Sequence, residues 1–126
     1  VAFSVNNLAE SVQWYKEKLG FKIIHNHKSK EMEFVLLELG EVKLELFNFG
    51  SETKPLPDYR KSLTDDLHTV GIKHLCLETE NFGEAIVDLK EKGVKFVTEI
   101  DKAAFGGKYI FFKDCNGILI ELYENS

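Results

Sequence analysis

The chain contains 126 residues, 44% of them hydrophobic and 29% charged, and its formal net charge at pH 7 is −5. An acidic balance without a concentrated basic patch argues against a nucleic-acid partner. No apolar run approaches the roughly 20 residues that cross a bilayer. These numbers predict a soluble protein with no membrane partner, long enough to form one compact domain.

The two cysteines, Cys76 and Cys115, lack the CxxC spacing of a metal or redox motif. Nothing in the sequence resembles a secretory signal. Reduced thiols and a cytoplasmic location are therefore expected.

The first half of the chain has the pattern of a strand, a helix and three further strands. Apolar and polar residues alternate over residues 1–5, which predicts a strand. Asn6 or Asn7 can cap the following helix, and Gly20 is suited to end it. The remaining strands are expected over 21–28, 32–39 and 42–47, with a tight turn at Gly40 and Glu41 before the last one.

The second half repeats this order after an irregular connection that contains both prolines. A short helix is expected in the connection, around residues 59–67. The strands and helix that follow are expected near 72–79, 82–92 (helix), 94–100, 108–113 and 118–123, with a turn at 114–117. The pattern predicts an α+β fold in which two βαβββ modules, about 1–49 and 71–126, share a single domain and are joined at about 50–70.

An internal repeat relates the two modules and pairs polar residues with one another. VAFSVNNLAESVQWYKEKLGF, which starts the chain, aligns with LCLETENFGEAIVDLKEKGV after a one-residue gap, and VKLELF aligns with ILIELY. Glu45 therefore corresponds to Glu121. The partner of His74 is the position just before Val1, and because the chain starts in strand pattern without methionine, we expect that residues precede it.

The three polar residues lie on strand faces that they share with aromatic or other apolar side chains. Alternation places Leu75 and Leu77 on one face and His74 on the other. Each glutamate shares its face with an aromatic residue, Glu45 with Phe47 and Glu121 with Tyr123. A carboxylate among apolar neighbours is costly to bury unless it is paired or binds a metal. Nitrogen and carboxylate donors suit Zn, Ni, Co, Mn or Fe(II). Solvent-facing glutamates and a satisfied strand histidine remain the alternative.

The other three histidines give weaker signals. His25 and His27 lie two residues apart on one predicted strand, a spacing that can chelate a metal, but no repeat partner supports them and nearby lysines indicate a solvated edge. His68 lies in the connection, where it either lines the mouth of a pocket or has no role.

The chain resembles the vicinal oxygen chelate superfamily, which includes glyoxalase I, methylmalonyl-CoA epimerase, extradiol dioxygenases and fosfomycin resistance proteins. The resemblance covers essentially the whole length and rests on the opening 21 residues and on the segments LELFNF, GIKHLCLETEN and FFKDCNGILIELYE. It implies a cupped mixed sheet with helices on the convex face and one divalent metal on the concave face. The implied ligands are Glu45, His74, Glu121 and a His, Gln or Glu before Val1.

An acid at position 45 is similar to the four-ligand site of glyoxalase I, and LELFNF, the proline-containing connection and GIKHL look most like small bacterial glyoxalase I-like proteins. The implied function is that of a lactoylglutathione lyase-like enzyme, which transfers a proton alpha to a carbonyl in a thiol adduct of a 2-oxoaldehyde. The metal would stabilise the enediolate oxygens, with Glu121 as ligand and base and Glu45 sharing that ability.

Three other functions stay open on the same scaffold: an acyl-CoA epimerase, an Fe(II) extradiol dioxygenase, and a non-catalytic small-molecule binding or resistance protein. The substrate contacts are also open. Glutathione carboxylates are best held by arginines, yet the chain has only Arg60. Arg60 and Lys108 are the candidate substrate-binding residues, and Gly106 and Gly107 mark either a mobile loop over the pocket or a plain turn.

Relatives in this superfamily commonly pair two chains. The resemblance therefore implies a homodimer, in which the site closes either within one chain or between two.

Overall fold

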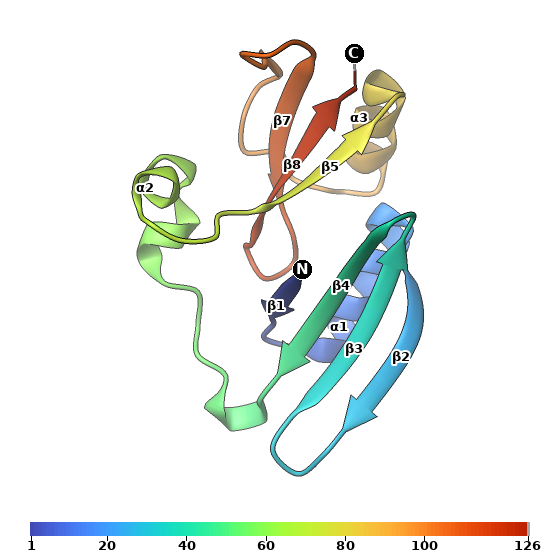
Figure 1. Cartoon of the computed structure of the whole chain (residues 1–126), viewed down its shortest axis with the longest axis vertical. Helices are drawn as coiled ribbons and strands as arrows, with labels where there is room; N and C mark the ends of the chain where they lie inside the picture. The colour runs from blue at the N-terminus through green and yellow to red at the C-terminus, as the bar shows by residue number, and fades with distance from the viewer. Residues whose placement is uncertain (126) are drawn as a thin grey trace. The chain divides into compact units, whose positions relative to one another are not determined.

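The computed structural model describes residues 1–125 and divides the chain into two compact units, Val1–Pro55 and Leu56–Ser126. Each unit contains one four-stranded mixed sheet, as Figure 1 shows. The predicted α+β fold of two βαβββ modules is confirmed. Most of the predicted connection belongs to the second unit, and the sharing of a single domain stays a prediction.

The first unit is built around one parallel and two antiparallel strand pairs, in the order β1-β4-β3-β2. Asn7 caps its helix, because the side-chain Oδ1 accepts a hydrogen bond from the Glu10 amide at 2.9 Å. Gly20 ends the helical segment with a φ of 83°, which favours glycine. The elements are β1 (Ala2–Ser4), α1 (Leu8–Trp14), a π-helical end η1 (Tyr15–Leu19), β2 (Lys22–Lys28), β3 (Glu33–Leu39) and β4 (Val42–Asn48).

The core of the first unit lies between α1 and the sheet. Leu44 and Leu46 are fully buried on β4, and Val12 and Tyr15 are buried on the helical side. Figure 1 shows α1 lying along β3 and β4, which it contacts. The predicted alternation of buried and open positions on β4 is therefore confirmed.

The connection forms three short helical segments, and two of them lie where one helix was expected. After η2 (Gly50–Glu52), η3 covers Asp58–Lys61 and α2 covers Leu63–His68. Ser62 separates them because its backbone is extended, and its hydroxyl accepts a hydrogen bond from the Asp65 amide at 3.4 Å to start α2.

The second unit repeats the arrangement with the strand order β5-β8-β7-β6. Asp114 organises the turn before the last strand, because its Oδ1 accepts hydrogen bonds from the amides of Asn116 at 2.8 Å and Ile118 at 2.9 Å. The helix α3 packs on β8. The elements are β5 (Leu75–Thr79), α3 (Phe82–Glu91), β6 (Asp101–Lys102), β7 (Lys108–Lys113) and β8 (Leu119–Glu124).

Two strand predictions were wrong. The strand expected over 94–100 is absent; the segment makes one isolated bridge, between Phe96 and Phe112, and the regular strand β6 has only two residues. The Val97 amide donates to the Phe111 carbonyl at 2.9 Å, but the Phe111 amide donates to the Thr98 hydroxyl at 3.0 Å, so a side chain interrupts the ladder.

The second wrong prediction is the start of β5, which lies at Leu75 and not at Ile72. The Arg60 guanidinium donates hydrogen bonds to the carbonyls of Ile72 and Lys73, and this replaces sheet pairing there. Over residues 1–125, none of the helices combines the length and the apolar character needed to span a membrane.

Candidate functional site

His74 and Glu121 meet on the open face of the second sheet. The Nε2 atom of His74 lies 2.8 Å from Oε2 of Glu121, and their side chains are 13% and 21% exposed. His74 directly precedes β5, and Glu121 lies in β8, which pairs with β5 in parallel. The prediction that these two residues share a face is confirmed.

Phe111 holds the imidazole ring from the side. It lies opposite Glu121 in the pairing of β7 with β8, and its ring meets the His74 ring edge-on, with centroids 4.8 Å apart. The Nδ1 atom of His74 is buried and has no hydrogen-bond partner among the described residues. Without a bound cation, an Nε2–H donating to the carboxylate leaves no buried donor unsatisfied, whereas a cation at Nε2 would place the ring proton on Nδ1.

Cys76 completes the surroundings of the carboxylate. It lies opposite Glu121 in the pairing of β5 with β8. Partial burial first, and the Glu121 charge second, raise the pKa of the Cys76 thiol to about 11. The thiol beside the Glu121 carboxylate is therefore protonated at neutral pH. Sequence reasoning missed this contact, although the alternation on β5 already placed Cys76 on the His74 face.

Glu45 occupies the equivalent position in the first unit. In the parallel pair β1/β4, Ala2 lies opposite Glu45, just as Cys76 lies opposite Glu121 in the pair β5/β8. His74 lies two residues before Cys76. The corresponding position in the first unit, two residues before Ala2, lies just before the start of the sequence. The register thus reproduces the correspondence that the repeat predicted, while the ligand role of Glu45 stays a prediction.

Aromatic rings share the face on which Glu45 lies. Phe47 follows two residues later on β4, and its ring centroid is 5.4 Å from that of Phe34 on β3. The rings of His25 and His27 lie 5.9 and 5.2 Å from Phe34, so both histidines contact this aromatic row. Both are exposed on the edge strand β2.

The part of each unit that the structure describes does not form a complete metal site by itself. Within residues 1–125, no three His, Cys, Asp or Glu side chains of one unit gather closely enough to hold an ion. His74 and Glu121 nevertheless fit two neighbouring coordination positions. Their 2.8 Å separation is close to the about 3 Å expected between ligand atoms that each lie about 2 Å from a cation.

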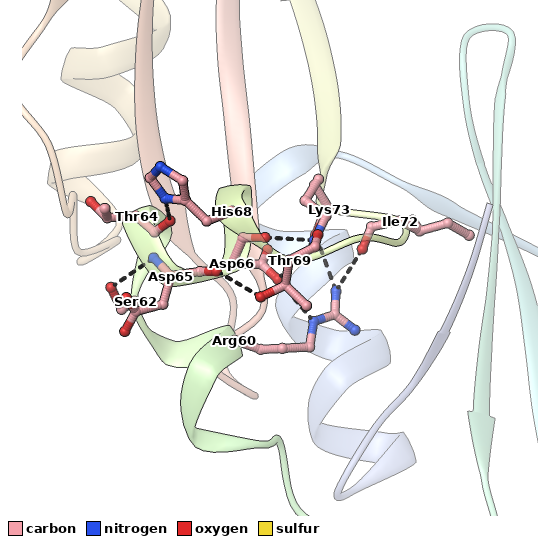
Figure 2. Close-up of polar contacts among 9 residues, drawn as sticks. All are labelled: Arg60, Ser62, Thr64, Asp65, Asp66, His68, Thr69, Ile72 and Lys73. Carbon is pink, nitrogen blue, oxygen red and sulfur yellow. Dashed lines mark hydrogen bonds and ion pairs between the residues drawn. The ribbon is translucent and has the colours of Figure 1, made fainter.

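The two predicted substrate-binding residues are placed differently from the site pair. Arg60 Nε lies 3.5 Å from the Asp66 carboxylate, and Figure 2 shows its guanidinium directed at the main chain of 72–73. On β7, Lys108 alternates with Tyr109 and so lies on the face opposite to Phe111. No contact in the structure tests a substrate role for Arg60 or Lys108, which stays a prediction.

The remaining candidates have local partners. His68 Nδ1 lies 2.7 Å from the Thr64 carbonyl within α2. The glycine loop packs against the end of β8, because the Tyr123 hydroxyl donates to the Gly106 carbonyl at 3.0 Å. A Cβ on Gly107 would lie 2.4 Å from the Glu124 carbonyl oxygen, so this close approach requires glycine.

Comparisons with known proteins agree over nearly the whole chain. Residues 1–122 match the family described as Glyoxalase/Bleomycin resistance protein/Dioxygenase superfamily. The human mitochondrial methylmalonyl-CoA epimerase is 30% identical, over 98% of this chain and 71% of that protein. The lactoylglutathione lyase of Schizosaccharomyces pombe is 31% identical, over 97% of this chain and 45% of that protein.

Solved structures confirm the fold. The glyoxalase family protein from Enterococcus faecalis has a TM-score of 0.82 and 29% identity, and the match covers 98% of this chain and 94% of that chain. A glyoxalase I mutant from Zea mays has a TM-score of 0.76 and 20% identity, covering 99% of this chain and 43% of that one. The chain therefore belongs to the glyoxalase/bleomycin resistance protein/dioxygenase superfamily.

Proposed function

We propose that the protein is a metal-dependent enzyme that transfers a proton at a carbon next to a carbonyl group. The observation that carries the proposal is the contact between His74 Nε2 and Glu121 Oε2 on the open face of the second sheet. Relatives named as an epimerase and a lyase, each matched over almost the whole chain, support an enzyme.

His74 and Glu121 would hold the cation, and Glu45 and a donor before Val1 are the further ligands that we infer. The imidazole nitrogen and carboxylate oxygens suit Ni, Zn, Co, Mn or Fe(II). When bound, a divalent cation at this position would supply Lewis-acid stabilisation of negative charge on substrate oxygens.

Glu121 is the base that we infer for the proton at the alpha carbon. Its carboxylate is partly exposed, so it can face a substrate on the open side of the sheet, while His74 Nε2 lies 2.8 Å from its Oε2 atom and Cys76 lies opposite it on β5. Phe111, which is buried beside it, limits the access of water. Glu45, at the equivalent position of the other unit, would provide the second acid or base.

An acyl-CoA is the substrate class that we favour. Glutathione has two carboxylates that arginines bind best, but the only arginine is engaged with Asp66 and with two main-chain carbonyls. The match to methylmalonyl-CoA epimerase also spans 71% of that protein. This favours epimerisation of an acyl-CoA over the glyoxalase I-like reaction predicted from the sequence.

The glyoxalase I-like reaction on a 2-oxoaldehyde thiol adduct is the second candidate. The lactoylglutathione lyase match supports it, although the chain spans less than half of that protein. In both reactions the first step is removal of a proton alpha to a carbonyl, so both predict the same role for Glu121.

The test is deuterium incorporation from D₂O, measured by proton NMR in the presence of Ni²⁺, Co²⁺, Mn²⁺ or Zn²⁺. Methylmalonyl-CoA and the hemithioacetal of methylglyoxal with glutathione are the two substrates. We expect metal-dependent exchange at the alpha carbon, reduced about 10²- to 10⁴-fold by Glu121→Gln. Glu124→Gln, the same substitution on the same strand, is the control and should exchange at the wild-type rate.

Exchange with neither substrate under any of the four metals would overturn the proposal. Oxygen uptake with catechols in the presence of Fe(II) would then identify a dioxygenase, and tight binding without turnover would identify a binding protein. A homodimer and a cytoplasmic location stay predictions; sedimentation equilibrium should give twice the chain mass.

A further inference from the structure

A cluster of charged side chains lies beside the segment that leads to His74. Asp66 in α2 is only 1% exposed, and both Arg60 Nε and Lys73 Nζ lie 3.5 Å from its Oδ1 atom. Figure 2 shows Arg60 and Lys73 approaching Asp66 from the two sides of the α2 end. A buried carboxylate is stable only when it is paired, so both cations are tied to this position.

The same two cations also bind the main chain. Arg60 Nη2 donates to the carbonyls of Ile72 at 3.4 Å and Lys73 at 3.1 Å. Lys73 Nζ donates to the carbonyls of Asp66, at 2.5 Å, and Thr69, at the end of α2. Because sheet pairing begins only at Leu75, these bonds hold the two residues before His74.

The helix that carries Arg60 is also fixed to the strand behind the imidazole. Lys113 Nζ on β7 donates to the Lys61 carbonyl at 2.9 Å. Two residues earlier on the same strand is Phe111, whose ring meets the His74 ring edge-on. The main chain before His74 and the ring that supports its side chain are therefore both connected to η3.

We propose that Arg60 and Asp66 are positioning residues, which set the main chain of residues 72–73 so that His74 Nε2 faces Glu121. The effect on catalysis rests on the proposed function, whereas the effect on His74 does not. Arg60 is suited to this task because its guanidinium forms an ion pair with Asp66 through Nε while Nη2 donates to the two carbonyls. A lysine would keep the positive charge near Asp66 but lose the paired contacts to the carbonyls.

The decisive variant is therefore Arg60→Lys in the full chain, compared with Lys61→Gln. Lys61 is the next residue on η3, and its side chain pairs with Asp58, not with Asp66. The first measurement is made in EDTA, by NMR with ¹⁵N-labelled histidine and by amide hydrogen exchange. The chain has four histidines, so His74→Gln assigns the His74 ring signal.

We expect Arg60→Lys to move the His74 ring signal, and to leave those of His25, His27 and His68 in place. The amides of residues 73–75 should exchange at least about 10-fold faster than in the wild type, while Lys61→Gln gives wild-type values. Asp66→Asn keeps the side-chain shape and is expected to change the same signals. If Arg60→Lys does not fold, this variant tests the positioning role in its place. Wild-type His74 signals and exchange in a folded Arg60→Lys or Asp66→Asn variant would overturn the inference.

Ni²⁺ binding and turnover give the second measurement. Positioning predicts an affinity for Ni²⁺ reduced about 10-fold or more and a lower kcat with little change in KM. A higher KM with unchanged His74 signals would instead make Arg60 a substrate contact and overturn the inference. Should the wild type bind no metal and exchange no proton, the proposed function fails, and the EDTA measurement still decides the positioning role.

Discussion

In both units the strand that carries the acidic residue is paired in the same way, whereas the opposite edge of the sheet differs. In both units a short first strand pairs in parallel with the strand that holds Glu45 or Glu121. The edge strand β2 in the first unit has seven residues, whereas its counterpart β6 has only two. The strand pairing around Glu45 and Glu121 is thus the same in both units, whereas the edge strand on the opposite side of each sheet differs in length.

A second feature concerns the main chain at the start of the first strand of each unit. In the second unit, Arg60 and Lys73 hold the main chain before His74 through the buried Asp66. In the first unit, the Glu45 amide donates to the Val1 carbonyl at 2.8 Å, so ordinary sheet pairing continues to that point. Val1 corresponds to Leu75, which also pairs in its sheet, so the side-chain support of the second unit acts one step earlier, on the residues before His74.

The largest expected effect tests the equivalence of the two glutamates. Each of Glu45→Gln and Glu121→Gln should lower metal-dependent proton exchange by about 10² to 10⁴, because each carboxylate would act as ligand and as acid or base. The rate of deuterium incorporation measures both. Wild-type turnover in Glu45→Gln would confine the chemistry to the second unit and break the comparison.

This equivalence is predictable from the sequence because it depends on local patterns. Alternation along a strand determines the faces of Glu45 and Glu121, and the internal repeat pairs the two residues. Cys76 could have been found in the same way, since it lies two residues after His74.

Other features depend on side chains that are distant in sequence. The start of β5 is set by Arg60, twelve residues before Ile72. The missing strand over 94–100 follows from the Thr98 hydroxyl taking a hydrogen bond from the Phe111 amide. Asp66 looks like a solvent-facing residue of a polar helix, and only the approach of Arg60 and Lys73 explains its burial.

The next prediction compares an ion pair in each unit. Arg60→Ala should lower the free energy of unfolding by about 3 kcal/mol, because Asp66 would stay buried with one cation fewer. In the first unit, Lys43 and Glu38 form an ion pair 3.4 Å apart with both side chains exposed, so Lys43→Ala should cost at most about 1 kcal/mol. Urea denaturation of the two variants measures the difference, and equal losses would contradict the stabilising role of the Asp66 cluster.

The helix caps offer a smaller contrast between the units. Asn7 caps α1 with its side chain, whereas Asn81 precedes α3 without a side-chain cap bond. Asn7→Ala should therefore lower the unfolding free energy by about 1 kcal/mol, and Asn81→Ala by clearly less. Thermal melts of the two variants provide the comparison, and an Asn81→Ala loss as large as that of Asn7→Ala would go against it.

The smallest effect concerns the thiol of the second unit, whose equivalent in the first unit is Ala2. Because the folded protein raises the pKa of Cys76 from about 9 to about 11, the unfolded chain loses its thiol proton first as the pH rises. The free energy of unfolding should therefore fall between pH 9 and pH 11, and this part of the fall should be absent in Cys76→Ala. Chemical denaturation of metal-free protein across this range measures it.

Alkylation of Cys76 sharpens the same point. In a Cys115→Ser background, iodoacetamide should react slowly at pH 9, and Glu121→Gln should speed the reaction because it removes the neighbouring negative charge. An unchanged rate in Glu121→Gln would show that the carboxylate does not act on the thiol.

The central claim is that His74 and Glu121 bind a divalent cation for chemistry at a carbonyl compound. Calorimetric titration of the metal-free full chain with Ni²⁺ tests it most directly, with His74→Gln as the variant and His68→Gln as the matched control. The claim predicts one ion per chain in the wild type and in His68→Gln, and a loss of affinity of at least about 10-fold in His74→Gln. Equal binding by His74→Gln and His68→Gln would contradict it.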